Sequence, residues 1–240
     1  MSDIIFDDPE RVRREIYRAF SSTGRAPTRA EVAVALGMGF DRVEAAFWWL
    51  AARQVIVLGN YAQIDLAPPF ASVNMGFSVS GAQSLWWGAS ALDSFAIPHL
   101  VEAEPRVLVA TACPGCRADL AWTVTRNAPP GGPQVAYFPT PAKRMWDDIL
   151  ATSRNQRIFC DRVCVERWLE RTREPRGEVL GLSTLWRIAA HWYDGLLESP
   201  YSRREPAAEA AYFASLGLTG QFWGIPAAIP RRQAAHVADA

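Results

Sequence analysis

The sequence has little cysteine, no net charge and no long apolar run, and each shortage narrows the functions to consider. Lysine and arginine total 25, and aspartate and glutamate also total 25, so no global field draws the chain toward nucleic acid or an anionic membrane. No apolar run approaches the roughly 18 residues that a bilayer span requires. The first residues, MSDIIFDDPERVRRE, lack the basic start and apolar core of a signal peptide. We therefore expect a cytoplasmic protein with neither a membrane nor a nucleic-acid partner.

Several familiar catalytic motifs are also missing. The sequence contains no glycine-rich phosphate loop, no G-x-S-x-G and no H-E-x-x-H. This argues against nucleotide-dependent and serine-hydrolase chemistry. Only three histidines are present, and a lone histidine on a helix face is more often a core residue than a ligand.

The four cysteines fall into two pairs. Cys113 and Cys116 belong to CPGC between two apolar runs, and Cys160 and Cys164 belong to FCDRVCVERWL. The first pair is typical of a zinc knuckle, and the second puts two thiols one helical turn apart on the same face. Cytosolic thiols stay reduced, and four thiolates can close a tetrahedral shell around zinc. The alternative is that Cys113 and Cys164 are only small buried hydrophobic residues.

Residues 1–66 are predicted to form a winged-helix domain. Helical patterns cover PERVRREIYRAFSSTG, TRAEVAVALG and DRVEAAFWWLAARQ. A capping box of Thr28 and Glu31 opens the second, and Asp41 is the expected N-cap of the third. Two alternating stretches around a Gly-Asn turn at 59–60 predict a β-hairpin. Three helices followed by such a hairpin are typical of a winged helix.

The third predicted helix does not resemble a DNA-reading surface. Its charged residues are of both signs, and FWWL separates them, so no basic stripe could follow a phosphate backbone. We expect the aromatic run to pack against the rest of the chain. A winged-helix regulator that senses a soft metal through its thiols remains an alternative.

A second domain is predicted over residues 81–225, after a linker over 67–80 and before a disordered tail over 226–240. The segment GAQSLWWGASALDSFAIPHLV is expected to be helical from about Trp87. RVLVATA and RADLAWTVT are expected to be strands on either side of CPGC. Further strands and amphipathic helices follow, so the fold class expected is α+β.

Asp93 is the one carboxylate in an apolar stretch, SALDSFAIPHL. A carboxyl group in such surroundings is either a helix cap or a desolvated acid with a raised pKa. Taken alone, such a carboxylate is more often structural.

The order of these motifs resembles the organomercurial (alkylmercury) lyase family. The resemblance rests on the winged helix, then W-x2-S-A-L-D-S-F-A-I-P-H-L, the strand-Cys-strand hairpin, F-C before a helix, and G-L-x-x-L-W-R-I-A-A-H-W-Y. It covers roughly residues 10–197. It implies that the second domain is an alkylmercury lyase-like core of mixed sheet and helices.

The resemblance also implies an active site. In that family a cysteine and an aspartate of a Cys-Ala-Leu-Asp stretch act with a distant cysteine of a Phe-Cys pair. The aspartate falls on Asp93, the distant cysteine on Cys160, and the first cysteine on Ser90. Cys113 matches a structural cysteine of the family, and Cys116 and Cys164 have no evident counterpart.

The serine matters because mercury strongly prefers sulfur to oxygen. Two thiolates load electron density onto the metal and weaken its bond to carbon, and a carboxylic acid then protonates the leaving carbon. Ser90 offers a hard hydroxyl in place of one thiolate. Cys164 could supply a second thiolate, or all four cysteines could be saturated by zinc.

Besides the winged-helix regulator described above, the sequence supports two further hypotheses about function. In the first, the chain is an enzyme that cleaves a carbon–mercury bond of a small organometallic substrate, using the Cys160 thiolate and Asp93, without a cofactor. In the second, it is a lyase-inactive relative with a structural four-cysteine zinc site and a different ligand or reaction.

Overall fold

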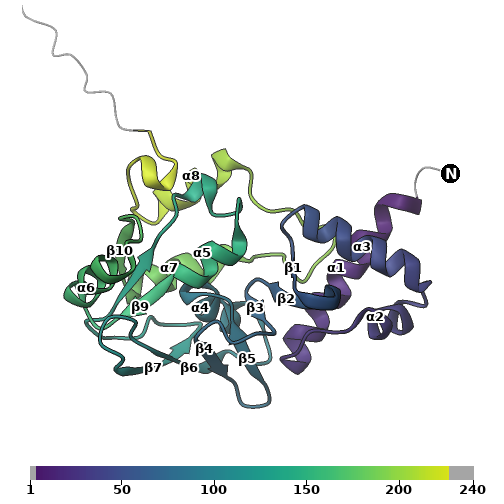
Figure 1. Ribbon diagram of the computed structural model, residues 1–240, viewed down its shortest axis with the longest axis horizontal. Coiled ribbons are helices and arrows are strands. Elements are labelled where there is room, and N and C mark those ends of the chain that lie inside the picture. The colour runs from purple at the N-terminus through teal and green to yellow at the C-terminus, as the bar shows by residue number, and fades with distance from the viewer. Residues whose placement is uncertain (1–3, 227–240) are drawn as a thin grey trace, which may run out of the picture.

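Helices and two antiparallel sheets are mixed along the chain, so the fold is α+β as the sequence predicts (Figure 1). The computed structural model describes residues 4–226. The predicted disordered tail lies almost wholly outside the described residues. No helix among those described is long and apolar enough to cross a membrane.

Three helices form the N-terminal region, to the right in Figure 1: α1 (Ile4–Thr23), α2 (Arg29–Leu36) and α3 (Phe40–Ala52). The predicted capping box is confirmed, with Thr28 and Glu31 each bonding the other's backbone, and α2 ends at a left-handed glycine. The predicted N-cap of α3 is wrong: Gly39 occupies that position, and Asp41 lies in the first turn. There its carboxylate still faces the positive end of the helix dipole.

The aromatic run of α3 divides between core and solvent. Phe47 and Leu50 are buried, whereas Trp48 is 55% exposed and Trp49 is 37% exposed. The expectation that the whole run packs inside is therefore wrong. At about 100° per residue, a helix that buries positions 47 and 50 must turn position 48 outward.

The larger sheet has seven strands in the order β1-β2-β3-β5-β4-β6-β7, and all neighbours are antiparallel. Its strands are β1 (Val57–Leu58), β2 (Ile64–Ala67), β3 (Phe70–Ala71), β4 (Phe77–Ser80), β5 (Leu85–Gly88), β6 (Arg106–Ala112) and β7 (Asp119–Thr125). The predicted hairpin of β1 and β2 is thus continuous with this sheet, and segment 67–80 contributes β3 and β4. The winged-helix assignment and the boundary at residue 66 stay predictions.

The helix α4 (Ala91–Leu100) lies at the centre of the molecule. It packs against the large sheet on one side and against α7 (Leu182–Trp192) on the other. Every residue from Ala91 to Pro98 is buried, as expected for a helix that is apolar on all faces. The predicted helical start at Trp87 is wrong, because Trp87 lies in β5, and Ser90 caps the helix instead.

A smaller sheet with the order β10-β8-β9 completes the core. Its strands are β8 (Val135–Phe138), β9 (Arg157–Phe159) and β10 (Glu178–Gly181). The helices around it are α5 (Ile149–Asn155), α6 (Arg162–Thr172) and α8 (Pro206–Ser215). Short 3-10 turns lie at Asn60–Ala62, Ala142–Arg144 and Gln221–Trp223. This arrangement places the end of β9 beside the turn that joins β6 to β7.

Candidate metal centre and a buried carboxylic acid

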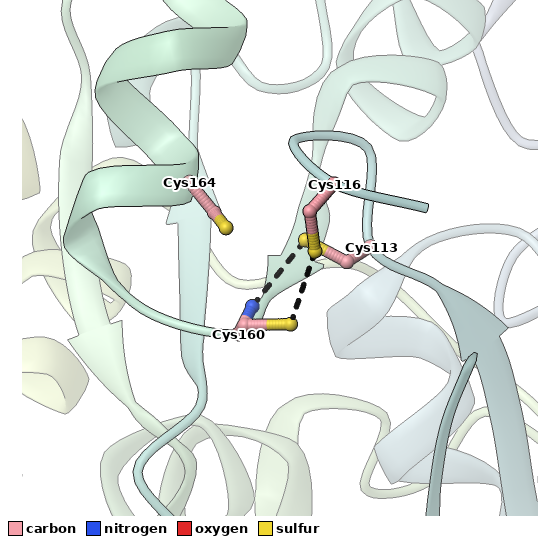
Figure 2. Close-up of side chains that lie close together, drawn as sticks. All are labelled: Cys113, Cys116, Cys160 and Cys164. Atoms are coloured by element: carbon pink, nitrogen blue, oxygen red, sulfur yellow. Dashed lines mark hydrogen bonds between the residues drawn. The ribbon is translucent and has the colours of Figure 1, made fainter. Parts of the chain in front are cut away.

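The four cysteines converge at the junction of the two sheets. Their sulfur atoms all lie within 4.8 Å of one another, and the Sγ atoms of Cys116 and Cys160 are 3.5 Å apart. Figure 2 shows two thiols projecting from the β6–β7 turn toward two others at the start of α6. All four are free thiols.

The first pair of thiols is positioned by a tight turn. The Cys113 amide donates to the Ala118 carbonyl at 2.8 Å, and the Arg117 amide donates to the Cys113 carbonyl at 2.8 Å. Gly115 lets this turn approach α6 closely, because a Cβ built on it would lie 2.5 Å from the carbonyl oxygen of Cys164. Any larger residue would push the two halves of the cluster apart.

The second pair of thiols is positioned by the beginning of α6. Asp161 is the N-cap of this helix, and its carboxylate accepts from the Cys164 amide at 2.7 Å. The Cys160 amide points at the Cys113 sulfur at 3.4 Å. Arg171, two turns along α6, donates to the Pro114 carbonyl at 2.5 Å, which ties the turn to the helix.

The thiols of the cluster differ in acidity. Cys116 is exposed, and a hydrogen bond from the Ala118 backbone together with the neighbouring thiols lowers its pKa to about 7. Burial and the adjacent thiols of Cys116 and Cys113 raise the pKa of Cys160 and of Cys164 to about 12. A cation among the sulfurs would oppose this mutual repulsion, and binding would release the remaining protons.

A second chemical feature is the buried carboxyl group of Asp93. It is 4% exposed and accepts a hydrogen bond from the Tyr193 hydroxyl at the end of α7. Burial raises the pKa of Asp93, although the hydrogen bond from Tyr193 and the adjacent Ser90 hydroxyl act in the opposite direction. Burial and the adjacent Asp93 also raise the pKa of Tyr193. The carboxyl group of Asp93 therefore stays protonated to a higher pH than that of an ordinary aspartate.

Ser90 has its hydrogen bonds satisfied by protein groups. Its hydroxyl oxygen accepts from the Asp93 amide at 3.2 Å and caps α4. The same hydroxyl donates to the Gln156 side-chain oxygen at 2.6 Å, which also accepts from the Leu92 amide at 3.1 Å. Ser90 thus serves as a cap and as a link between α4 and the residue before β9.

Ser90 and Asp93 line a small cavity with Gln156, Trp146 and Tyr193. Its volume is about 30 Å³, which exceeds the roughly 10–15 Å³ needed to hold one water molecule. None of the four cysteines lines it. Cys160 lies four residues after Gln156 along β9, which corresponds to at most about 14 Å of extended chain.

The structure thus brings together Cys113, Cys116, Cys160 and Cys164 in one place, and Ser90 with Asp93 in another. It brings no thiol into the cavity of Asp93. The sequence interpretation missed Tyr193 and Gln156, which lie 100 and 66 residues from their partners. The spacing Ser90-x-x-Asp93 is itself a capping signal and could have placed the start of α4.

The sequence and the fold of this chain can be compared with those of known proteins. The sequence model of the alkylmercury lyase family matches residues 70–194, which is more than half of the chain and includes α4 and all four cysteines. The chain belongs to the alkylmercury lyase family. The resemblance inferred from the motif order is therefore confirmed.

The fold of the alkylmercury lyase family also recurs among solved structures. The crystal structure of the mercury-bound form of MerB2 is similar with a TM-score of 0.65 over 82% of this chain and 96% of that chain, at 16% sequence identity. At this sequence identity the similarity shows a shared fold. No curated protein matches the sequence.

Proposed function

We propose that this member of the alkylmercury lyase family binds one zinc ion through Cys113, Cys116, Cys160 and Cys164. The observation that carries the proposal is the convergence of four sulfurs within 4.8 Å. A tetrahedral zinc site with Zn–S bonds of about 2.3 Å separates its sulfurs by about 3.8 Å. The 3.5 Å between Cys116 and Cys160 is close to that value, so small side-chain movements would suffice.

The zinc ion would join two structural units. Cys113 and Cys116 belong to the turn of the seven-stranded sheet, and Cys160 and Cys164 belong to the end of β9 and the start of α6. With four protein ligands the ion has no open position, which is typical of structural rather than catalytic zinc. In this proposal Asp93 and its cavity serve a different ligand or reaction.

Elemental analysis and thiol titration of the purified protein test this function. We expect one zinc per chain and four thiols that react only after a chelator removes the ion. Asp93→Asn is a matched control, because it removes a buried carboxyl group without touching a cysteine and should leave the zinc content unchanged. A protein with four freely reactive thiols and no zinc would refute the proposal.

Carbon–mercury cleavage is the second candidate, and the buried acid favours it. In this reaction the Cys160 thiolate binds the mercury of an organomercurial cation, and protonated Asp93 gives its proton to the carbon. The carbon–mercury bond breaks, the hydrocarbon leaves, mercury stays on sulfur, and Asp93 becomes a carboxylate. The raised pKa of Asp93 suits it to hold that proton.

Carbon–mercury cleavage requires the acid and the thiol to act on the same substrate, and in this structure they lie apart. The carbon bound to mercury has to reach Asp93, yet the cavity there has about 30 Å³ and no cysteine lines it. The reaction would require the Cys160 side chain to move out of the cysteine cluster. It would also require the hydrogen bond between Ser90 and Gln156 to break.

Released hydrocarbon, measured with an organomercurial and excess thiol, tests the second candidate. If cleavage occurs, Asp93→Asn and Cys160→Ser abolish it. Ser90→Cys adds a soft ligand beside the acid and should raise cleavage above that of the wild type. Equal release by the wild type and by the doubly substituted Cys160→Ser, Asp93→Asn protein would rule out the lyase reaction.

A further inference from the structure

A larger cavity lies between the N-terminal helices and the core, and neither function above uses it. Its volume is about 340 Å³, within the range of small-molecule sites. Residues of α1 and α3 form one wall, and the end of α7 with the segment after it forms another.

The charges that line this cavity are unbalanced. Arg13 is neutralised by Glu10, since their side chains lie 2.7 Å apart, and it also donates to the carbonyls of Leu196 and Glu198. The other two lining arginines, Arg53 and Arg203, form no ion pair with any carboxylate of the described chain. The cavity therefore carries an uncompensated positive charge, which favours an anion.

Arg203 is the clearest sign of a missing partner. Its Nη2 donates to the Arg53 carbonyl at 2.5 Å, and its guanidinium lies 4.4 Å from the centre of the Trp146 ring. Its Nη1 is buried and has no hydrogen-bond partner. A buried donor without an acceptor is costly, so an acceptor in the cavity would favour a rotation of the guanidinium that turns Nη1 toward it. A guanidinium presents its N–H groups as a fork that matches a carboxylate.

Aromatic surfaces accompany both free cations. Arg53 lies 3.7 Å from the centre of the Trp49 ring, and both tryptophans, Trp49 and Trp146, line the cavity. Each arginine lies over the face of its tryptophan, and Trp146 also stacks on Trp192 with 6.1 Å between the ring centres. The rings therefore hold the two guanidinium groups in place at the cavity.

The cavity also adjoins the buried acid. Tyr193, Trp146 and Pro68 line both this cavity and the small one at Asp93, and the Tyr193 hydroxyl donates to Asp93. A molecule in the larger cavity would contact the side chain that holds the acid.

We propose that this cavity binds a small carboxylate such as benzoate, with its carboxylate group on Arg203 and Arg53. The proposal does not depend on the zinc centre or on carbon–mercury cleavage. The proposed site is selective for anions and lies beside Asp93.

Binding of benzoate to the full-length, metal-loaded protein tests the site, with the neutral isostere benzamide as the matched ligand. Tryptophan fluorescence and calorimetry report binding, because two tryptophans line the cavity. Benzoate should bind saturably and at least about 10-fold more tightly than benzamide, the factor expected for a charge-assisted hydrogen bond. Equal affinities, or no saturation with benzoate by about 10 mM, would overturn the proposal.

Variants locate the site. Arg203→Gln and Arg53→Gln should each weaken benzoate binding about 10-fold and leave benzamide unchanged. Arg204→Gln is the control, because Arg204 donates to the Trp192 carbonyl at 2.8 Å and does not line the cavity. Zinc content should be the same in all four proteins. If the control loses as much benzoate affinity as Arg203→Gln, the binding site lies elsewhere.

Discussion

The cysteine cluster and the cavity at Asp93 differ in how the chain builds them. Each half of the cluster comes from five residues or fewer of contiguous sequence, and one of its thiols is exposed. The cavity instead joins side chains that are 66 and 100 residues apart, and its carboxyl group is buried. The soft thiols lie in the first and the buried carboxyl group in the second. Carbon–mercury cleavage needs both in one place, and this separation is what the following experiments probe.

Removal of the metal should have the largest effect. We expect chelation, or the substitution Cys164→Ser, to lower the melting temperature by about 10 °C, since a ligand present at about 1,000 times its Kd adds roughly 4 kcal/mol. Calorimetric melting curves with and without a chelator measure this. A chelator should have no further effect on Cys164→Ser, and a wild-type curve that ignores the chelator would contradict a structural ion.

Gly115→Ala tests whether the cluster depends on the close approach of its halves. The added Cβ would lie 2.5 Å from the Cys164 carbonyl oxygen, so we expect a cost of about 1–3 kcal/mol and weaker zinc binding. Competition with a metal indicator measures the affinity. Gly131→Ala is the control, because a Cβ there meets nothing within 4 Å. Equal affinities in the two variants would show that the approach is not required.

The substitution Ser90→Ala changes the cavity at Asp93 and leaves the cysteine cluster untouched. It removes the cap of α4 and the hydrogen bond to Gln156, and we expect a cost of about 1–2 kcal/mol. Thermal unfolding should show a decrease of about 2–8 °C with unchanged zinc content. Ser22→Ala, at an exposed position of α1, provides the comparison. Loss of zinc from Ser90→Ala would mean that the two regions are coupled.

The pH dependence of stability should differ between the wild type and Asp93→Asn. The pKa of Asp93 is raised on folding from the ordinary value of 3.8, so its contribution to stability is complete below about pH 3.8 and is lost as pH rises through the folded pKa. The slope cannot exceed about 1.4 kcal/mol per pH unit. Denaturant unfolding of wild type and Asp93→Asn from pH 4 upward measures it, and parallel curves would contradict a raised pKa.

Local signals in the sequence predicted much of the fold. The capping box at Thr28, the hairpin around CPGC and the helix after Phe159 were all found from patterns of a few residues. The two pairs of cysteines were found in the same way, because each spacing has its own stereochemical meaning. Membership of the alkylmercury lyase family followed from the order of such motifs.

Features that depend on tertiary contacts were not predicted. The segment around Trp87 is apolar enough for a helix or a buried strand, and only pairing of Trp87 with Ala71 and Ser78 makes it a strand. The partners of Asp93 and Ser90 come from the end of α7 and the residue before β9, and no spacing in the sequence connects them. The cavity between α3 and the core has the same origin.

The turn at Gly115 has a consequence for how the protein assembles. The two halves of the cluster can each form early from local sequence, but 47 residues separate Cys113 from Cys160. An ion that binds all four thiols would close this loop and remove conformational entropy from the incomplete chain. An ion bound there would therefore favour the folded chain by restricting the unfolded one.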